Sequence, residues 1–126
     1  MHELSVCQGL LTQVEEIARN EKARHVDLIR LQIGPLSGVV PELLQQAFSI
    51  ARAGTAAADA ELAIETLPIR IRCTQCGAEN DAPPNRLLCA SCGDYRTQLL
   101  SGDELLLASV ELTRDSENVL EEANHV

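Results

Sequence analysis

The first clear pattern in the chain is a stripe of apolar side chains at helical spacing near the N-terminus. Apolar residues recur there at steps of three and four, with glutamines, glutamates and an arginine largely on the opposite side. The stripe comprises Leu4, Cys7, Leu11, Val14 and Ala18. It predicts a first helix that ends near residues 20–22.

A strand pattern follows between residues 25 and 34. Ile29, Leu31 and Ile33 alternate there with polar side chains, which is typical of a strand with one buried face. The dipeptide Gly34-Pro35 then marks a turn. We expect a strand that ends at this turn.

A second helix is expected over Pro41–Ala53. Proline is favoured at the first helical position, and Gly54 suits the stop. Its apolar face would comprise Leu44, Ala47, Phe48 and Ala51.

Two further strands are predicted by alternation, at Ala60–Ile69 and Glu104–Leu112. In the first, Leu62 and Ile64 share one side. In the second, one side would carry Leu106, Ala108, Val110 and Leu112.

The composition changes sharply between the last two predicted strands. Residues 70–98 hold four of the five cysteines and a Pro-Pro pair, which indicates a separate small module. We therefore predict an α+β fold: a small sheet of about three strands with two helices, plus an inserted zinc-ribbon-like module. Residues 1–69 with 99–114 would form the α+β domain. Residues 115–126 form an acidic tail, for which disorder and a short helix are both expected alternatives.

Composition limits the class of protein. The 126 residues are 45% hydrophobic and only 2% aromatic, so the core must be aliphatic. No stretch approaches the roughly 18 apolar residues of a membrane span, and the start lacks the basic and apolar regions of a signal peptide. We expect a cytoplasmic protein without membrane contact.

The charge balance argues against nucleic acid as a partner. The formal net charge is −9, and the 10 basic residues are scattered along the chain. Nucleic-acid binding needs a basic face, and single strands also need stacking aromatics. The acidity fits a protein that handles cations or docks on a basic partner, and it equally fits a well-solvated surface. No catalytic triad, phosphate-binding glycine loop or carboxylate pair is evident, so we expect no enzyme.

Four cysteines carry the strongest chemical signal. Cys73, Cys76, Cys89 and Cys92 form C-x2-C-x12-C-x2-C, and a glycine follows each pair. A two-residue gap lets a tight turn direct both thiolates at one metal, and glycine permits the left-handed backbone of that turn. Four thiolates leave no open coordination position, so the pattern predicts a structural zinc site whose metal drives folding of the module.

Three other uses of these cysteines compete with zinc binding. Disulfides would need an oxidising compartment. A rubredoxin-like iron centre uses the same ligands but normally has aromatic residues around it, and only Tyr95 is near. A redox-active pair would be single and would lie beside a βαβ pattern. Cys7, the fifth cysteine, lies on the apolar stripe and is interpreted as a packing residue.

The N-terminal residues Met1, His2 and Glu3 offer a second metal site. The α-amine and the His2 amide nitrogen close a five-membered chelate ring, and that amide and the imidazole Nδ1 close a six-membered one. The Glu3 amide or carboxylate supplies a fourth donor. Such a planar nitrogen and oxygen set suits Ni(II) or Cu(II). Taken alone, the triplet is better explained as an ordinary translation start.

Several of these segments together resemble the HypA/HybF family of hydrogenase nickel-incorporation proteins. They are MHELSVCQGLL at the N-terminus, LQIGPLSGV at the first strand, the double C-x2-C-G module and the closing SGDELLLASVEL. The resemblance runs from Met1 to about Arg114. The tail beyond is longer than expected for the family, and no function is assigned to it.

The resemblance implies a nickel metallochaperone that helps insert nickel into [NiFe]-hydrogenase and, in some organisms, serves urease. It implies a GTPase partner of the HypB type and the hydrogenase large subunit as recipient. It also implies a nickel site at Met1, His2 and Glu3 and a zinc site at the four module cysteines. A zinc-ribbon adaptor that assembles proteins without any specific nickel site is the alternative from another class.

Overall fold

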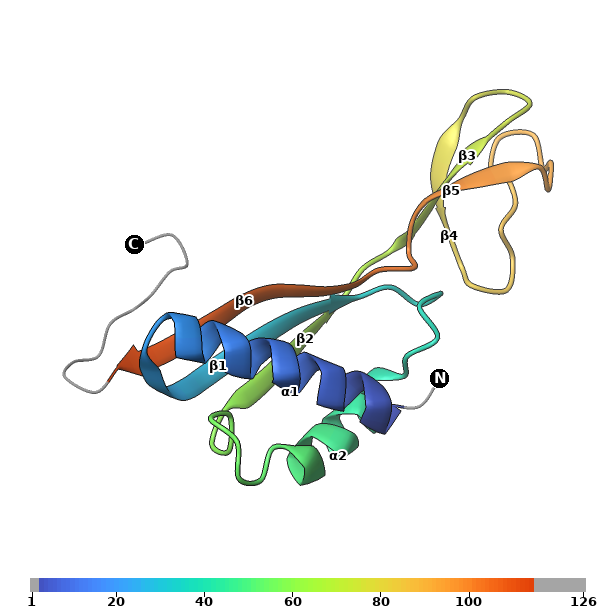
Figure 1. The fold of residues 1–126 in the computed structure, drawn as a ribbon. Coiled ribbons are helices and arrows are strands. Elements are labelled where there is room, and N and C mark those ends of the chain that lie inside the picture. The colour runs from blue at the N-terminus through green and yellow to red at the C-terminus, as the bar shows by residue number, and fades with distance from the viewer. Residues whose placement is uncertain (1–2, 115–126) are drawn as a thin grey trace.

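The computed structural model describes residues 3–114, which form two helices and six strands in two small sheets (Figure 1). The elements are α1 (Glu3–Asn20), β1 (Ala23–Ile33), α2 (Pro41–Ala51), β2 (Glu61–Thr66), β3 (Ile69–Cys73), β4 (Glu79–Ala82), β5 (Thr97–Ser101) and β6 (Leu105–Arg114). The strand orders are β2-β1-β6 and β4-β3-β5. The expected α+β class, with a three-stranded sheet, two helices and an inserted module, is confirmed. The predicted tail lies outside the described residues.

The first sheet has β1 at its centre. It pairs in parallel with β2 and antiparallel with β6. The connection from β1 to β2 passes through α2, as a parallel crossover requires. Figure 1 shows α1 and α2 covering the same face of this sheet. The opposite face carries polar pairs such as Arg30–Glu111 at 3.3 Å, so it suits contact with water.

The core lies between the two helices and this sheet, and it is aliphatic as expected. Val14, Ile29 and Leu44 are fully buried. The predicted stripe of α1 is confirmed from Cys7 onward, but Leu4, in the first turn, is 47% exposed. Within residues 3–114, neither helix is long and apolar enough to cross a membrane.

The alternation predicted for β6 reverses at a β-bulge. The register with β1 skips Ala108, so the side chains before it point to the opposite face from the predicted one. Leu107 packs against the core, and Leu106 is 49% exposed. Val110 and Leu112, after the bulge, lie on the predicted core side.

The strand predicted over Ala60–Ile69 is two strands in different sheets. β2 ends at Thr66, and β3 begins at Ile69. Pro68 lies between them, where it has no N–H to donate to a ladder. The Leu67 N–H still donates to the Ile33 carbonyl at 2.9 Å, so the first sheet ends at this point.

Residues 69–101 form the second sheet and its loops, and we call this segment the ribbon. It enters from β2 and leaves toward β6 through neighbouring stretches of chain. The Ser101 hydroxyl donates to the Pro68 carbonyl at 3.2 Å, which joins the two stretches. Figure 1 shows the ribbon projecting from one end of the first sheet.

Candidate metal centre

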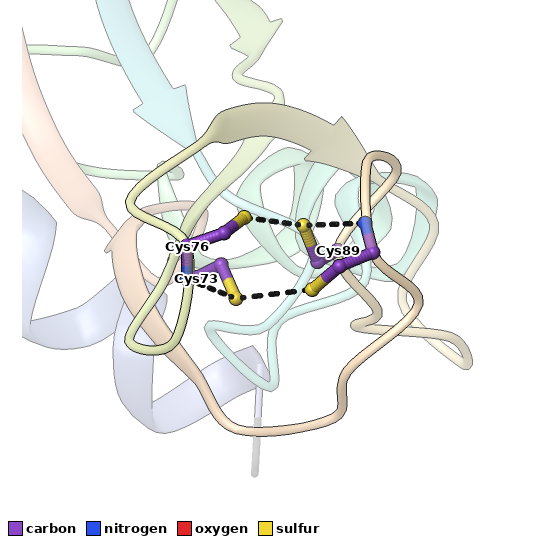
Figure 2. Close-up of side chains that lie close together, drawn as sticks. Cys73, Cys76 and Cys89 are labelled. Carbon is purple, nitrogen blue, oxygen red and sulfur yellow. Dashed lines mark hydrogen bonds between the residues drawn. The ribbon is translucent and has the colours of Figure 1, made fainter.

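The four cysteines of the ribbon converge on one point. Their sulfur atoms all lie within 4.8 Å of one another. The Cys73 and Cys92 sulfurs are 3.7 Å apart, and the Cys76 and Cys89 sulfurs are 3.6 Å apart. Figure 2 shows the thiols of Cys73, Cys76 and Cys89 pointing toward one another from two turns. A tetrahedral zinc–thiolate site with bonds of about 2.3 Å has sulfur–sulfur edges of about 3.8 Å. The cluster therefore fits zinc in size and donor chemistry.

The first turn, residues 73–77, follows directly from β3, and we call it the first knuckle. Backbone N–H groups of Gln75 and Cys76 donate to the Cys73 sulfur at 3.3 and 3.4 Å. The Gly77 N–H donates to the Cys73 carbonyl at 3.0 Å, and Gly77 has φ of 80°. Only glycine adopts that left-handed backbone at little cost, which explains its place after the second cysteine.

The second knuckle, residues 89–93, repeats this geometry. The Cys92 N–H donates to the Cys89 sulfur at 3.4 Å. The Gly93 N–H donates to the Cys89 carbonyl at 2.8 Å, and Gly93 has φ of 77°. Cys73 and Cys89, the first cysteine of each knuckle, are buried, whereas Cys76 and Cys92 are exposed.

The thiols of the cluster differ in acidity. The Cys76 N–H lowers the pKa of Cys73, and the Cys92 N–H lowers the pKa of Cys89 to about 6. For Cys76 and Cys92 a backbone N–H also lowers the pKa, but hydrogen bonds with neighbouring thiols, together with burial, outweigh it. The pKa of Cys76 is therefore raised, and that of Cys92 rises to about 12. A metal must displace protons from the second cysteine of each knuckle.

Residues 94–96 connect the two knuckles. The Cys89 N–H donates to the Asp94 carbonyl at 3.0 Å, and the Thr74 N–H donates to the Arg96 carbonyl at 2.9 Å. The Arg96 guanidinium bonds the Asp94 carboxylate at 2.8 Å and lowers its pKa to about 2. The sequence prediction missed these residues, because they have no spacing signature of their own.

The predicted N-terminal site lies mostly outside the described residues, since Met1 and His2 are not among them. Glu3 is the first residue of α1, and its carboxylate accepts a hydrogen bond from the Val40 N–H at 3.2 Å. Val40 is the residue before α2. The start of α1 is thus attached to the start of α2, in the part of the fold that excludes the ribbon.

The chain's other cysteine and histidines, Cys7, His25 and His125, belong to neither predicted metal site. Cys7 is fully buried in the core, and this burial raises the pKa of its thiol. Its interpretation as a packing residue is therefore supported by its place in the fold. His25 is exposed on β1, and His125 lies outside the described residues.

The sequence of the chain is similar to those of known proteins. The sequence profile described as "Hydrogenase/urease nickel incorporation, metallochaperone, hypA" matches residues 1–112. The chain is 46% identical over 112 residues to the hydrogenase maturation factor HypA of Nitrosospira multiformis, with 89% of this chain and 97% of that protein covered. It is 43% identical over 115 residues to HypA of Aquifex aeolicus, with 91% and 100% covered.

Solved structures agree with the sequence comparisons. The solution structure of the Ni metallochaperone HypA from Helicobacter pylori matches with a TM-score of 0.66 and 26% identity, covering 91% of this chain and all of that one. A second solution structure of a HypA protein matches with a TM-score of 0.68, also at 26% identity. The likeness therefore extends over both sheets.

Proposed function

The chain belongs to the HypA family of nickel metallochaperones and hydrogenase maturation factors, and from this premise we propose that its own nickel site is the N-terminus. The Met1 amine, the His2 amide and imidazole, and the Glu3 amide would bind one Ni(II) in a plane. The zinc ligands would be Cys73, Cys76, Cys89 and Cys92. The observation that carries the proposal is the Met-His-Glu start on a chain whose family handles nickel.

The position of Glu3 supports this assignment. Its carboxylate accepts from the Val40 N–H, so the residue next to His2 is held against the loop before α2. A cation at the start of a helix is normally repelled by the helix dipole. Two deprotonated amides would cancel the two positive charges of Ni(II), so that the bound complex would have no net charge to repel.

We propose that the two sheets belong to parts of the chain that bind different metals. Residues 1–69 with 99–114 would form the nickel-binding domain, and residues 70–98 the zinc-binding module. The zinc would be structural, because four thiolates close its coordination sphere. The nickel is cargo, which the chain would pass on without itself catalysing a reaction.

Delivery of nickel requires partners in the same compartment. We propose that the chain acts in the cytoplasm with a GTPase of the HypB type and that the large subunit of [NiFe]-hydrogenase receives the metal. Urease would be a second recipient where the cell makes one. The net charge of −9 suits docking on a basic partner surface. Family membership does not favour the alternative of an adaptor without a nickel site.

The decisive experiment is a nickel titration of the untagged protein beside His2→Ala. We expect one Ni(II) per native chain, with the diamagnetic spectrum of planar coordination. His2→Ala should lose this binding and retain its zinc. His25→Ala is the matched control, because His25 is exposed on β1, outside the proposed ligand set. Full nickel affinity in His2→Ala would exclude the proposed site.

A second arm tests the free amine. Acetylation, or an N-terminal extension of several residues, removes the Met1 α-amine as a ligand without changing any side chain. Nickel affinity should then fall about as far as in His2→Ala, with zinc content unchanged. Undiminished binding by the acetylated protein would show that the amine is not a ligand.

A further inference from the structure

The two knuckles are attached to the ribbon in different ways. The first knuckle joins β3 to β4, and the Cys73 N–H donates to the Ala78 carbonyl at 2.8 Å, so the strand pair positions it directly. The second knuckle lies within residues 83–96, where the chain between β4 and β5 forms neither helix nor strand. The sheet ladder therefore does not position Cys89 and Cys92.

One side chain from β4 reaches across to this irregular segment. Asn80 Nδ2 donates to the Leu88 carbonyl at 3.4 Å, and its Oδ1 accepts from the Ala90 N–H at 3.1 Å. These two backbone groups belong to the residues immediately before and after Cys89. The side chain thus contacts the chain on both sides of a buried cysteine of the cluster.

The base of this side chain is fixed by the sheet. Asn80 pairs with the buried Ile71 in the β3–β4 ladder. Its Nδ2 also donates to the Asp81 carbonyl at 2.9 Å, which restricts rotation of the amide. The amide orientation is unambiguous, because a backbone N–H can only donate and so must face the oxygen. A side chain at this place must donate and accept at once, which asparagine does and aspartate or alanine does not.

We propose that Asn80 is a positioning residue for the zinc centre, which holds Cys89 at its distance from Cys73 and Cys76 before and after the metal binds. The inference rests on the proposed zinc ligands and concerns a residue outside them. Groups that orient metal ligands through hydrogen bonds typically change metal affinity by about 10- to 100-fold when removed. Without Asn80, part of the free energy of zinc binding would be needed to order the second knuckle. The zinc affinity would therefore fall.

The test compares Asn80→Ala and Asn80→Asp with Glu79→Gln in the full-length protein. Glu79 precedes Asn80 on β4, and its carboxylate pairs with Arg72 at 2.8 Å, on the same strand pair. Glu79→Gln therefore weakens the β3–β4 pair without touching the second knuckle. Zinc affinity is measured by competition with a chromophoric chelator. Substitution with Co(II) reports the coordination geometry by absorption.

We expect Asn80→Ala to weaken zinc binding about 10- to 100-fold and Glu79→Gln to change it less than about threefold. Asn80→Asp should also weaken binding, since its carboxylate faces the Leu88 carbonyl. Saturating Co(II) should still give the spectrum of four thiolates in both Asn80 variants, because no ligand is removed. Far-UV circular dichroism of the same samples verifies that the first sheet remains folded, and nickel titration verifies that the proposed N-terminal site is intact.

Zinc affinity of Asn80→Ala within about threefold of native would overturn the proposal, as would an equal loss in Glu79→Gln. Failure of Asn80→Ala to reach the four-thiolate spectrum with saturating Co(II) would also overturn it, because a residue that only positions Cys89 removes no ligand. If the native chain itself binds no zinc, the assigned ligands are wrong and the role of Asn80 is refuted with them. Absence of nickel binding alongside normal zinc binding contradicts only the proposed nickel site.

Discussion

Gly34 and Gly102 meet backbone to backbone where the two sheets join. A Cβ atom added to Gly34 would overlap the Gly102 carbonyl group and lie 2.7 Å from the Asp103 nitrogen. The Gly102 oxygen accepts a hydrogen bond from the Leu36 N–H at 2.7 Å, and the Gly34 N–H donates to the Glu104 carbonyl at 2.9 Å. The turn after β1 is therefore tied to the segment that leads from the ribbon into β6.

Gly34→Ala should destabilise the protein by roughly 3 kcal/mol, because the added methyl group meets backbone that no side-chain rotation can move away. Urea unfolding followed by circular dichroism measures the loss. Gly9→Ala is the control: Gly9 lies in α1 with no heavy atom within 4 Å of an added Cβ. It should stabilise the helix by about 0.5–1 kcal/mol. Equal effects of the two substitutions would contradict the close contact.

Removal of zinc should destabilise the ribbon and leave the stability of the first sheet unchanged. The ribbon buries few apolar side chains, and none of them belongs to the core cluster of α1, α2 and the first sheet. Amide hydrogen exchange after chelation measures this directly. Protection should fall in residues 69–101 and stay unchanged in β1 and β6. Loss of protection in both sheets together would show that the two fold as one unit.

Proton release on zinc binding should increase as the pH falls. A thiol with a pKa of about 6, as at Cys89, is largely ionised at neutral pH and has no proton to give up. In mildly acidic solution, below that pKa, the same thiol is protonated and must release its proton to bind the metal. Calorimetry in buffers of different ionisation enthalpy should therefore find about one additional proton released at the lower pH. The zinc affinity should fall more steeply with acidity below about pH 6. If the number of protons released did not change with pH, the low pKa of Cys89 would be contradicted.

Cys7→Ser should lower stability and leave metal binding unchanged. The substitution puts a hydroxyl group into a fully buried aliphatic site, at a cost of about 1–3 kcal/mol. Cys7→Ala removes the sulfur without adding a polar group, so its smaller effect serves as the comparison. Urea unfolding measures the stability, and nickel and zinc titrations measure the sites. Altered nickel affinity in the folded Cys7→Ala protein would reassign Cys7 to the nickel site.

Local periodicity is enough to predict where most elements lie. The apolar stripe of α1 depends only on contacts with one core, and so does the alternation of Ile29, Leu31 and Ile33 on β1. Each of these segments therefore carries its own signal. The spacing of the four cysteines likewise predicts a cluster that the fold brings together.

Features that depend on another part of the chain cannot be predicted in this way. The segment Leu105–Leu107 is apolar at every position, so alternation alone does not reveal that a bulge at Ala108 turns Leu107 inward. Asn80 looks like any polar strand residue until the second knuckle is seen beside it. The contact of Glu3 with Val40 joins residues far apart in sequence, which no local pattern records.

The adjacent entry and exit of the ribbon have a consequence for protein engineering. Because Pro68 and Ser101 are in hydrogen-bond contact, a replacement for everything between them has only to bridge two neighbouring strand ends. A short turn grafted at that point would yield a protein of about three quarters of the original length, built on the α1, α2 and β2-β1-β6 scaffold alone. Nickel binding by such a truncated chain could then be measured without any contribution from the thiolate cluster.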